Sequence, residues 1–164
     1  MCLGLHDYLL SSVIALDAAQ VSLNMNDLIA LLYLSSASDS LTDADHQNIL
    51  QVSQANNQRS DISGVLCSGG GHFIQVLEGP QKEVLKSYLR ILDDPRHTDC
   101  LLIGITPLQN RIFERWSMGH INVTSQDMLQ RRESLMNCWQ DQGQGSGLDL
   151  VQIMRALIYG SPND

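Results

Sequence analysis

The segment from Leu28 to Ser35 is apolar on both faces of a strand. Alternate residues of a strand point to opposite faces of the sheet. One face would carry Ile29, Leu31, Tyr33 and Ser35, and the other Leu28, Ala30, Leu32 and Leu34. A strand with two apolar faces is typical of the centre of a sheet. The sequence therefore predicts a sheet built around residues 28–35.

Two helices are expected on either side of a hairpin. Thr42 followed by Asp45 resembles a capping box, which predicts a helix to about Asn56. Gly79-Pro80 is a favourable start for a second helix. The run Asp93-Asp94-Pro95 is interpreted as a solvated stop signal that ends this helix.

Four further strands complete the expected fold. The run Ser68-Gly69-Gly70-Gly71 is typical of a tight turn, so it predicts a hairpin between the two apolar runs that flank it. The expected strands are Ile62–Cys67, His72–Leu77, Cys100–Thr106 and Trp116–Asn122. The order β-α-β-β-α-β-β predicts an α+β fold, a ferredoxin-like sandwich with two helices on one sheet face.

Three regions are expected along the chain. Residues 1–26 form an N-terminal extension that we expect to be helical, residues 27–123 form the central domain, and residues 124–164 form a C-terminal helical cap. Met25 is an alternative start of the domain, with the residues before it either an extra helix or a start-site artefact. Helices are expected over Ser125–Trp139 and Leu148–Tyr159, both with amphipathic patterns. The extension contains an apolar stretch, Tyr8–Leu16, but no Lys or Arg, so a signal peptide is not expected.

The composition of the chain argues against several classes of binding partner. The chain has 10 Lys and Arg against 18 Asp and Glu, a net charge of −8, which is a poor match for nucleic acid or an anionic membrane. Its four cysteines are scattered without CxxC spacing, so we expect reduced thiols in a cytoplasmic protein and no metal site. No apolar run is long enough to cross a bilayer. Neither a catalytic triad nor a phosphate-binding glycine loop is recognisable, so no enzyme activity is expected.

Two polar residues lie in strands that are otherwise apolar. Tyr33 and Gln75 are both expected to be buried, and an unsatisfied buried polar group costs roughly 1–3 kcal/mol. The simplest interpretation is that the phenol and the amide satisfy each other, with another polar group completing the set.

Other residues have two readings each. Asn56 and Asn57 could end a helix or direct two amides at a ligand. Arg90 could stabilise the end of the second helix through the helix dipole, or it could bind a phosphate or carbonyl group. Trp116 and Met118 share a strand face, as core residues usually do.

Together these residues resemble the BLUF family of blue-light sensors that use FAD. The matching motifs are Leu-Leu-Tyr-Leu-Ser-Ser (31–36), Asn56-Asn57, Ile-Ser-Gly-Val-Leu (62–66), Phe-Ile-Gln-Val-Leu-Glu-Gly (73–79), Asp-Pro-Arg-His (94–97) and Arg-Trp-Ser-Met-Gly (115–119). Each motif alone is modest, but their order and separations are specific. The resemblance covers residues 28–122.

The resemblance implies a light-switch role for five residues. Tyr33 matches the tyrosine that donates an electron and a proton to the excited flavin. Gln75 matches the glutamine that switches its hydrogen bonds between tyrosine and flavin. Trp116 and Met118 match the pair that moves in or out after the switch, and Ser35 matches a residue near the tryptophan or the glutamine.

The resemblance also implies a flavin-binding set. Asn57 matches the asparagine at the C4 carbonyl and N3 edge of the ring, and Asn56 matches its neighbour. Ile49 and Ile91 match the branched residues that sandwich the ring, and Arg90 matches a basic residue near a flavin carbonyl or the flavin chain. FAD is the expected cofactor, with FMN or riboflavin as alternatives.

The function implied is that of a short, single-domain BLUF protein. The signal is expected to pass through the fifth strand to the C-terminal helices, and from there to a protein partner or a homo-oligomer. The alternative is a ferredoxin-like protein-interaction module without functional photochemistry. A flavin-dependent enzyme is the least favoured reading, because no catalytic base is apparent beyond Tyr33 and Gln75.

Overall fold

A computed structural model describes residues 27–38, 43–113, 117–141 and 150–159. The elements are β1 (Leu28–Ala37), α2 (Asp43–Arg59), β2 (Ser63–Gly69), β3 (His72–Pro80), α3 (Gln81–Leu92), β4 (His97–Pro107), β5 (Gly119–Asn122), α4 (Ser125–Asp141) and α5 (Leu150–Tyr159). The expected helices in the N-terminal extension, the Thr42 cap and Trp116 lie outside the described residues.

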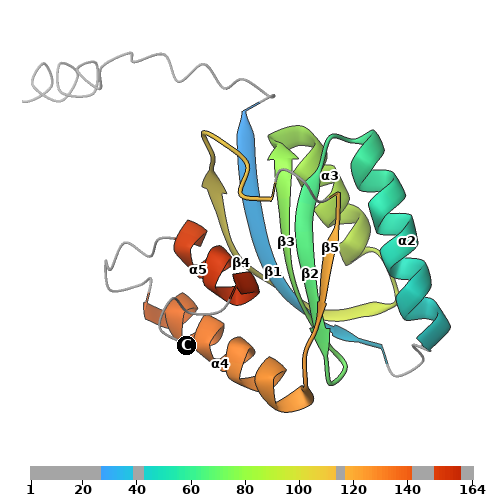
Figure 1. Cartoon of the computed structure of the whole chain (residues 1–164), viewed down its shortest axis with the longest axis vertical. Helices are drawn as coiled ribbons and strands as arrows, with labels where there is room; N and C mark the ends of the chain where they lie inside the picture. Colours follow the sequence, from blue (N-terminus) through green and yellow to red (C-terminus); the bar gives the residue numbers. More distant parts are fainter. Residues whose placement is uncertain (1–26, 39–42, 114–116, 142–149, 160–164) are drawn as a thin grey trace, which may run out of the picture.

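The five strands form one sheet in the order β4-β1-β3-β2-β5. All neighbours are antiparallel except β2 and β5, which are parallel. Helices α2 and α3 cover one face of the sheet, and α4 and α5 lie against the other (Figure 1). The predicted α+β, ferredoxin-like fold is confirmed, with β1 paired on both of its edges.

Two cores lie on the two faces of β1, as its alternating apolar residues predict. Ile29, Leu31 and Tyr33 belong to the core beneath α2 and α3. Ala30, Leu32 and Leu34 belong to the core shared with α4 and α5. The burial of apolar surface on both faces is the main driving force that holds the sheet between its helices.

Strand β3 ends at Pro80 rather than Leu77, and β4 begins at His97 rather than Cys100. Two further predicted boundaries, both next to the site, were also wrong. Helix α2 ends at Arg59, beyond Asn56, so Asn56 and Asn57 lie within the helix and are not its terminators. The chain turns at Asp61, which has a positive φ of 52°. Strand β5 begins at Gly119, because its parallel ladder pairs only with Val65–Ser68 of β2, and Met118 therefore precedes the strand.

Gly64 marks a close approach between β2 and β3. A Cβ atom at this position would lie 2.1 Å from the carbonyl oxygen of Val76, so one of the two strands would have to shift. We expect Gly64→Ala to lower the free energy of unfolding by about 1–3 kcal/mol or more, as forced overpacking does. Urea unfolding measures the effect.

Gly71 in the hairpin turn supplies the control. Its φ is 76°, its surroundings are open, and asparagine tolerates this conformation. Gly71→Asn should therefore be the milder substitution. An unfolding midpoint for Gly64→Ala equal to that of Gly71→Asn would contradict the steric argument.

Candidate functional site

Tyr33 and Gln75 lie directly opposite each other in the antiparallel ladder of β1 and β3. Both are buried, at 0% and 4% exposed. The Tyr33 hydroxyl donates a hydrogen bond to Oε1 of Gln75. The two polar groups thus satisfy each other, which confirms the prediction made from their apolar strands.

The second end of the Gln75 amide reaches Met118. Nε2 of Gln75 donates to Sδ of Met118 at 3.3 Å. Met118 is buried in the same core as Tyr33, just before β5. A thioether sulfur is a weak acceptor, so this contact is the weaker of the two bonds that orient the amide.

Burial also sets the chemistry of Tyr33. Its ring lies 5.2 Å from that of Tyr88, with the planes inclined at 53°. Burial raises the pKa of the Tyr33 phenol well above its ordinary value, and the nearby Cys100, Tyr88 and Asp94 raise that pKa further. The phenol is therefore a neutral hydrogen-bond donor throughout the physiological pH range.

A cleft opens beside this pair. It is lined by two groups of residues that the sequence singled out, the aliphatic Ile49 and Ile91 and the polar Asn56, Asn57, Gln75 and Arg90, together with Met118. Ile49 and the asparagines come from α2, Arg90 and Ile91 come from α3, and the sheet beneath the two helices supplies Gln75. The fold thus brings seven of the ten predicted site residues to one place.

Two polar side chains of α2 are hydrogen-bonded to the segment that precedes β5. Nδ2 of Asn57 donates to the carbonyl of Ser117 at 2.9 Å, and Nε2 of Gln54 donates to the carbonyl of Met118 at 3.2 Å. These bonds fix the chain around Met118 against α2. Asn57 is buried and donates through one nitrogen, which leaves its Oδ1 for a further donor.

Arg90 lies in the last turn of α3. Its Nε donates to the carbonyl of Lys86 at 3.3 Å, and its Nη2 donates to the Ser87 hydroxyl at 3.1 Å. The guanidinium is therefore held along its own helix at the mouth of the cleft.

Ser35 is placed differently from the other predicted residues. It is buried two positions after Tyr33, and its hydroxyl shares a 3.1 Å hydrogen bond with Nδ1 of His97. The His97 ring contacts the Phe73 ring at 5.2 Å and lines the cleft. Ser35 thus reaches the cleft through His97.

The charged pair Asp94 and Arg96 also lines the cleft, although it was interpreted only as part of a stop signal and a family motif. Arg96 donates to both carboxylate oxygens of Asp94, with Nε at 2.9 Å from Oδ1 and Nη2 at 2.5 Å from Oδ2. The hydrogen bond from Arg96 lowers the pKa of the Asp94 carboxyl below its ordinary value. In the sequence, the signal for this ion pair was an acidic residue, Asp94, two positions before a basic residue, Arg96.

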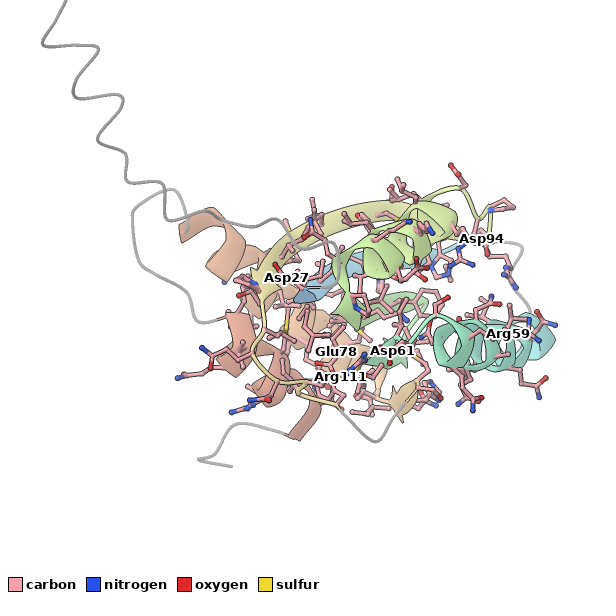
Figure 2. The ribbon with its side chains drawn as sticks, turned by 90° about the horizontal axis from the view of Figure 1, so that it is seen from above. Asp27, Arg59, Asp61, Glu78, Asp94 and Arg111 are labelled. Atoms are coloured by element: carbon pink, nitrogen blue, oxygen red, sulfur yellow. The ribbon has the colours of Figure 1, made fainter. Side chains whose placement is uncertain are left out.

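Glu78 is the other residue that the sequence analysis missed. It is fully buried in β3 and accepts hydrogen bonds from the Ser63 hydroxyl at 2.8 Å and from the backbone N–H groups of Ile112 and Phe113 at 2.7 and 2.6 Å. Arg111 closes this cluster by an ion pair with Asp61 at 2.8 Å. In Figure 2, Glu78, Asp61 and Arg111 lie together, well apart from Asp94.

Among the described residues, no group of three or more His, Cys, Asp or Glu side chains could hold a metal ion. None of the helices found in that part of the chain has the length and apolarity needed to cross a membrane.

The raised pKa of Tyr33 predicts a loss of stability at alkaline pH. Unfolded tyrosine releases its proton near pH 10, whereas folded Tyr33 keeps its proton to higher pH. The stabilisation from this difference is present below about pH 10 and is lost as pH rises through the folded pKa. Between about pH 8 and about pH 10.5 the native chain should therefore lose more unfolding free energy than Tyr33→Phe. Urea unfolding at the two pH values measures this difference, and equal losses in both proteins would contradict it.

Comparison with known proteins shows the family of this chain. A family model described as BLUF, sensors of blue light using FAD, matches residues 28–119. The photoactivated adenylate cyclase subunit beta of Euglena gracilis is 37% identical over 92 residues, which cover 56% of this chain and 11% of that protein. The blue light- and temperature-regulated antirepressor BluF of Escherichia coli (strain K12) is 36% identical over 132 residues, 80% of this chain and 32% of that protein.

Solved structures agree with the fold. The dark-state structure of BlrB, a BLUF protein, superposes with a TM-score of 0.62 at 28% identity, covering 82% of this chain and 100% of that chain. A bacterial light-regulated adenylyl cyclase gives a TM-score of 0.57 at 37% identity, covering 71% and 35% of the two chains. This chain therefore spans about a tenth of its cyclase relative from Euglena and about a third of the bacterial cyclase structure. By its family match over residues 28–119 and the fold built around Tyr33 and Gln75, the chain belongs to the BLUF family.

Proposed function

We propose that this chain is a blue-light sensor that binds a flavin in the cleft between α2 and α3. The observation that carries the proposal is the buried chain of contacts from Tyr33 through Gln75 to Met118, which opens onto that cleft. Residues 27–123 would form the sensing unit. A cytoplasmic location is part of the same proposal, because the described cysteines, Cys67 and Cys100, are free thiols.

The residues of the cleft fit a flavin. An isoalloxazine ring is flat with apolar faces and a polar rim, so it needs aliphatic contacts above and below and hydrogen-bonding groups at its edge. Ile49 on α2 and Ile91 on α3 would sandwich the ring. The amides of Asn56, Asn57 and Gln75 would meet its rim.

Arg90 would bind either the carbonyl edge of the flavin ring or the flavin side chain. It lines the cleft near the end of α3, where a phosphate could approach from solvent. The family description favours FAD. FMN and riboflavin carry the same ring, so the sandwich and the rim contacts would accept them as well.

The switch would act through the two ends of the Gln75 amide. A bound flavin would supply the absorption of blue light, and Tyr33 would be the residue that gives up an electron and a proton. Tyr33 now donates to Oε1 of Gln75, and Nε2 of Gln75 faces Met118. Rotation or tautomerisation of the amide exchanges its donor and acceptor ends, so a different group would face the Tyr33 oxygen and the flavin C4 carbonyl.

The signal would leave the pocket through the segment that precedes β5. A changed Gln75 amide no longer offers its N–H to Met118, whose carbonyl and neighbour Ser117 are bonded to α2. Strand β5 follows at Gly119 and leads into α4. Trp116 would take part in the same movement. A protein partner or a second copy of the chain would then read the altered helices.

The alternative is a protein-interaction module of the same fold without photochemistry. The buried Tyr33, Gln75 and Asn57 favour the sensor, because an interaction module has no need to bury these polar groups. Arg90 lines the same cleft at its mouth. No enzyme activity of this chain is proposed. Any catalysis in longer relatives belongs to those proteins.

Absorbance of the purified protein in the dark and under blue light tests the proposal. We expect a bound flavin spectrum with a small red shift on illumination that reverses in the dark, because a new hydrogen bond to the C4 carbonyl lowers the excited-state energy. A protein that stays colourless after incubation with FAD, FMN and riboflavin would refute the proposal.

Two substitutions test the switch itself. Tyr33→Phe removes the hydroxyl donor, and Gln75→Leu removes both ends of the amide. Each variant should retain flavin, which the remaining cleft residues hold, and should lose the red shift. Arg90→Lys is the matched control, since it changes the cleft mouth and leaves the switch intact. A normal photocycle in either switch variant would contradict the mechanism while leaving flavin binding in place.

A further inference from the structure

An apolar flank of α3 faces away from the cleft. Leu85, Leu89 and Leu92 recur at i, i+4 and i+7, so they share one side of the helix. Ser87 and Ile91 line the cleft on the opposite side. Leu89 is 59% exposed and Leu92 is 42% exposed, which is unusual for a regularly spaced leucine row.

Strand β4 continues this surface. Leu102 and Ile105 are the ladder partners of Tyr33 and Leu31, so they point to the sheet face that carries α3. Both are exposed. Within the described part of the chain, β4 pairs only with β1, so its outer edge borders the same surface. We call Leu85, Leu89, Leu92, Leu102 and Ile105 the apolar strip.

The chain that precedes β1 arrives at one end of the apolar strip. The carbonyl of Asp27 accepts a hydrogen bond from the N–H of Gln81, the first residue of α3, at 3.0 Å. The carbonyl of Leu28 accepts from the N–H of Leu108, just past the end of β4, at 2.8 Å. Figure 2 shows Asp27 beside these elements. Residues before Asp27 are therefore tethered next to the strip.

Those residues have a matching pattern. Leu9, Val13 and Leu16 repeat the i, i+4, i+7 spacing of the α3 leucines. Asp7 and Asp17 are the acidic residues of segment 1–26, which has no Lys or Arg. On α3, the exposed Lys82 lies on the same side as Leu89, while Lys86 is ion-paired with Glu83 at 3.0 Å. The apolar spacing therefore matches that of the α3 leucines, and Asp17, next to Leu16, is opposite in charge to Lys82.

We propose that residues 5–17 of this chain form an amphipathic helix that docks on the apolar strip. From Leu85 to Leu92 the strip runs about 10 Å along α3. The ten residues from 17 to 26 can span about 33 Å, so the segment reaches the strip with length to spare. The helix would lay Leu9, Val13 and Leu16 against the α3 leucines and β4.

A second copy of the chain fits the strip less well than this segment. In a symmetric dimer each strip would face its own image, which would bring Lys82 and Lys86 of both copies together. The tether instead gives the N-terminal segment an effective concentration on the order of millimolar at the strip. Docking would also cover the outer edge of β4, which is otherwise open to pairing with another strand.

Site-specific photo-crosslinking of the full chain tests the proposal. The crosslinking amino acid p-benzoylphenylalanine replaces Leu89, and mass spectrometry of a mixture of ¹⁵N-labelled and unlabelled chains identifies the joined peptide. We expect a crosslink to residues 1–24 of the same chain. Leu129 on α4, which is 57% exposed on the other face of the sheet, is the matched control position and should give about tenfold less of this product. Leu92 is a second reporting position on the strip.

A pair of substitutions sharpens the test. Val13→Asp places a charge on the proposed contact face and should reduce the Leu89 crosslink about tenfold. Ser11→Asp adds the same charge on the opposite side of the segment and should leave the yield unchanged. Capture of a second copy, capture of any other segment, no capture from either Leu89 or Leu92, or equal effects of the two aspartates would overturn the proposal. None of these readouts depends on a photocycle.

Discussion

The register between β1 and β3 decides whether this molecule has a site at all. Tyr33 lies opposite Gln75 because Leu31 lies opposite Leu77 and Ser35 lies opposite Phe73. Side chains alternate with a period of two, so a slip by one residue would set Ile74 or Val76 against the phenol. The hydroxyl and the amide would then both be buried without partners, at roughly 1–3 kcal/mol for each unsatisfied group. The apolar alternation and the polar pair therefore favour the same register.

Strand β3 also positions the chain that completes the site, and it uses both of its faces to do so. Gln75 holds Met118 on the cleft face. Glu78, three residues later and hence on the other face, holds the backbone of Ile112 and Phe113. A carboxylate that accepts two backbone N–H groups and a hydroxyl in a buried site is a strong anchor, because charge-assisted bonds gain strength where water is excluded. The segment that leads to β5 is thus fixed at its start by Glu78 and at its end by Gln75, Gln54 and Asn57.

The sequence predicted the strands and the hairpin of this fold well, because strand alternation and turns are determined by residues that are neighbours in the sequence. The two apolar faces of residues 28–35 and the glycine turn before His72 depend on residues that are neighbours in sequence. The Tyr33–Gln75 pair could be predicted across 42 residues because both lay in strands that are otherwise largely apolar. The family resemblance supplied the remaining cleft residues, and the structure gathers six of them around one cleft.

The predictions that were wrong or missing also have physical reasons. The end of α2 was misplaced because asparagine is compatible with both a helix interior and a terminus, and the actual turn is made by Asp61. Glu78 was missed because a carboxylate next to a glycine resembles a solvated turn residue. Besides the Ser63 hydroxyl, its partners are backbone N–H groups 34 and 35 residues later, which carry no side-chain signal. Asp94 was read as a stop signal, although its partner Arg96 directs it to the cleft.

The contacts of β1 add a second connection between the proposed switch and the C-terminal helices. Nη1 of Arg132 on α4 donates to the carbonyl of Ser35 at 3.2 Å, two residues from Tyr33 on the same strand. Arg132 is half-buried, and this burial lowers the pKa of its guanidinium. A donor in that position is sensitive to small movements of its acceptor, because the hydrogen bond replaces lost hydration. Under the proposed function, a change at Tyr33 would therefore reach α4 directly along β1, while a change at Gln75 reaches the same helix through Met118 and β5. Because α4 is linked to both Tyr33 and Gln75 in this way, it would be the element best placed to respond if the proposed switch rearranged their hydrogen bond.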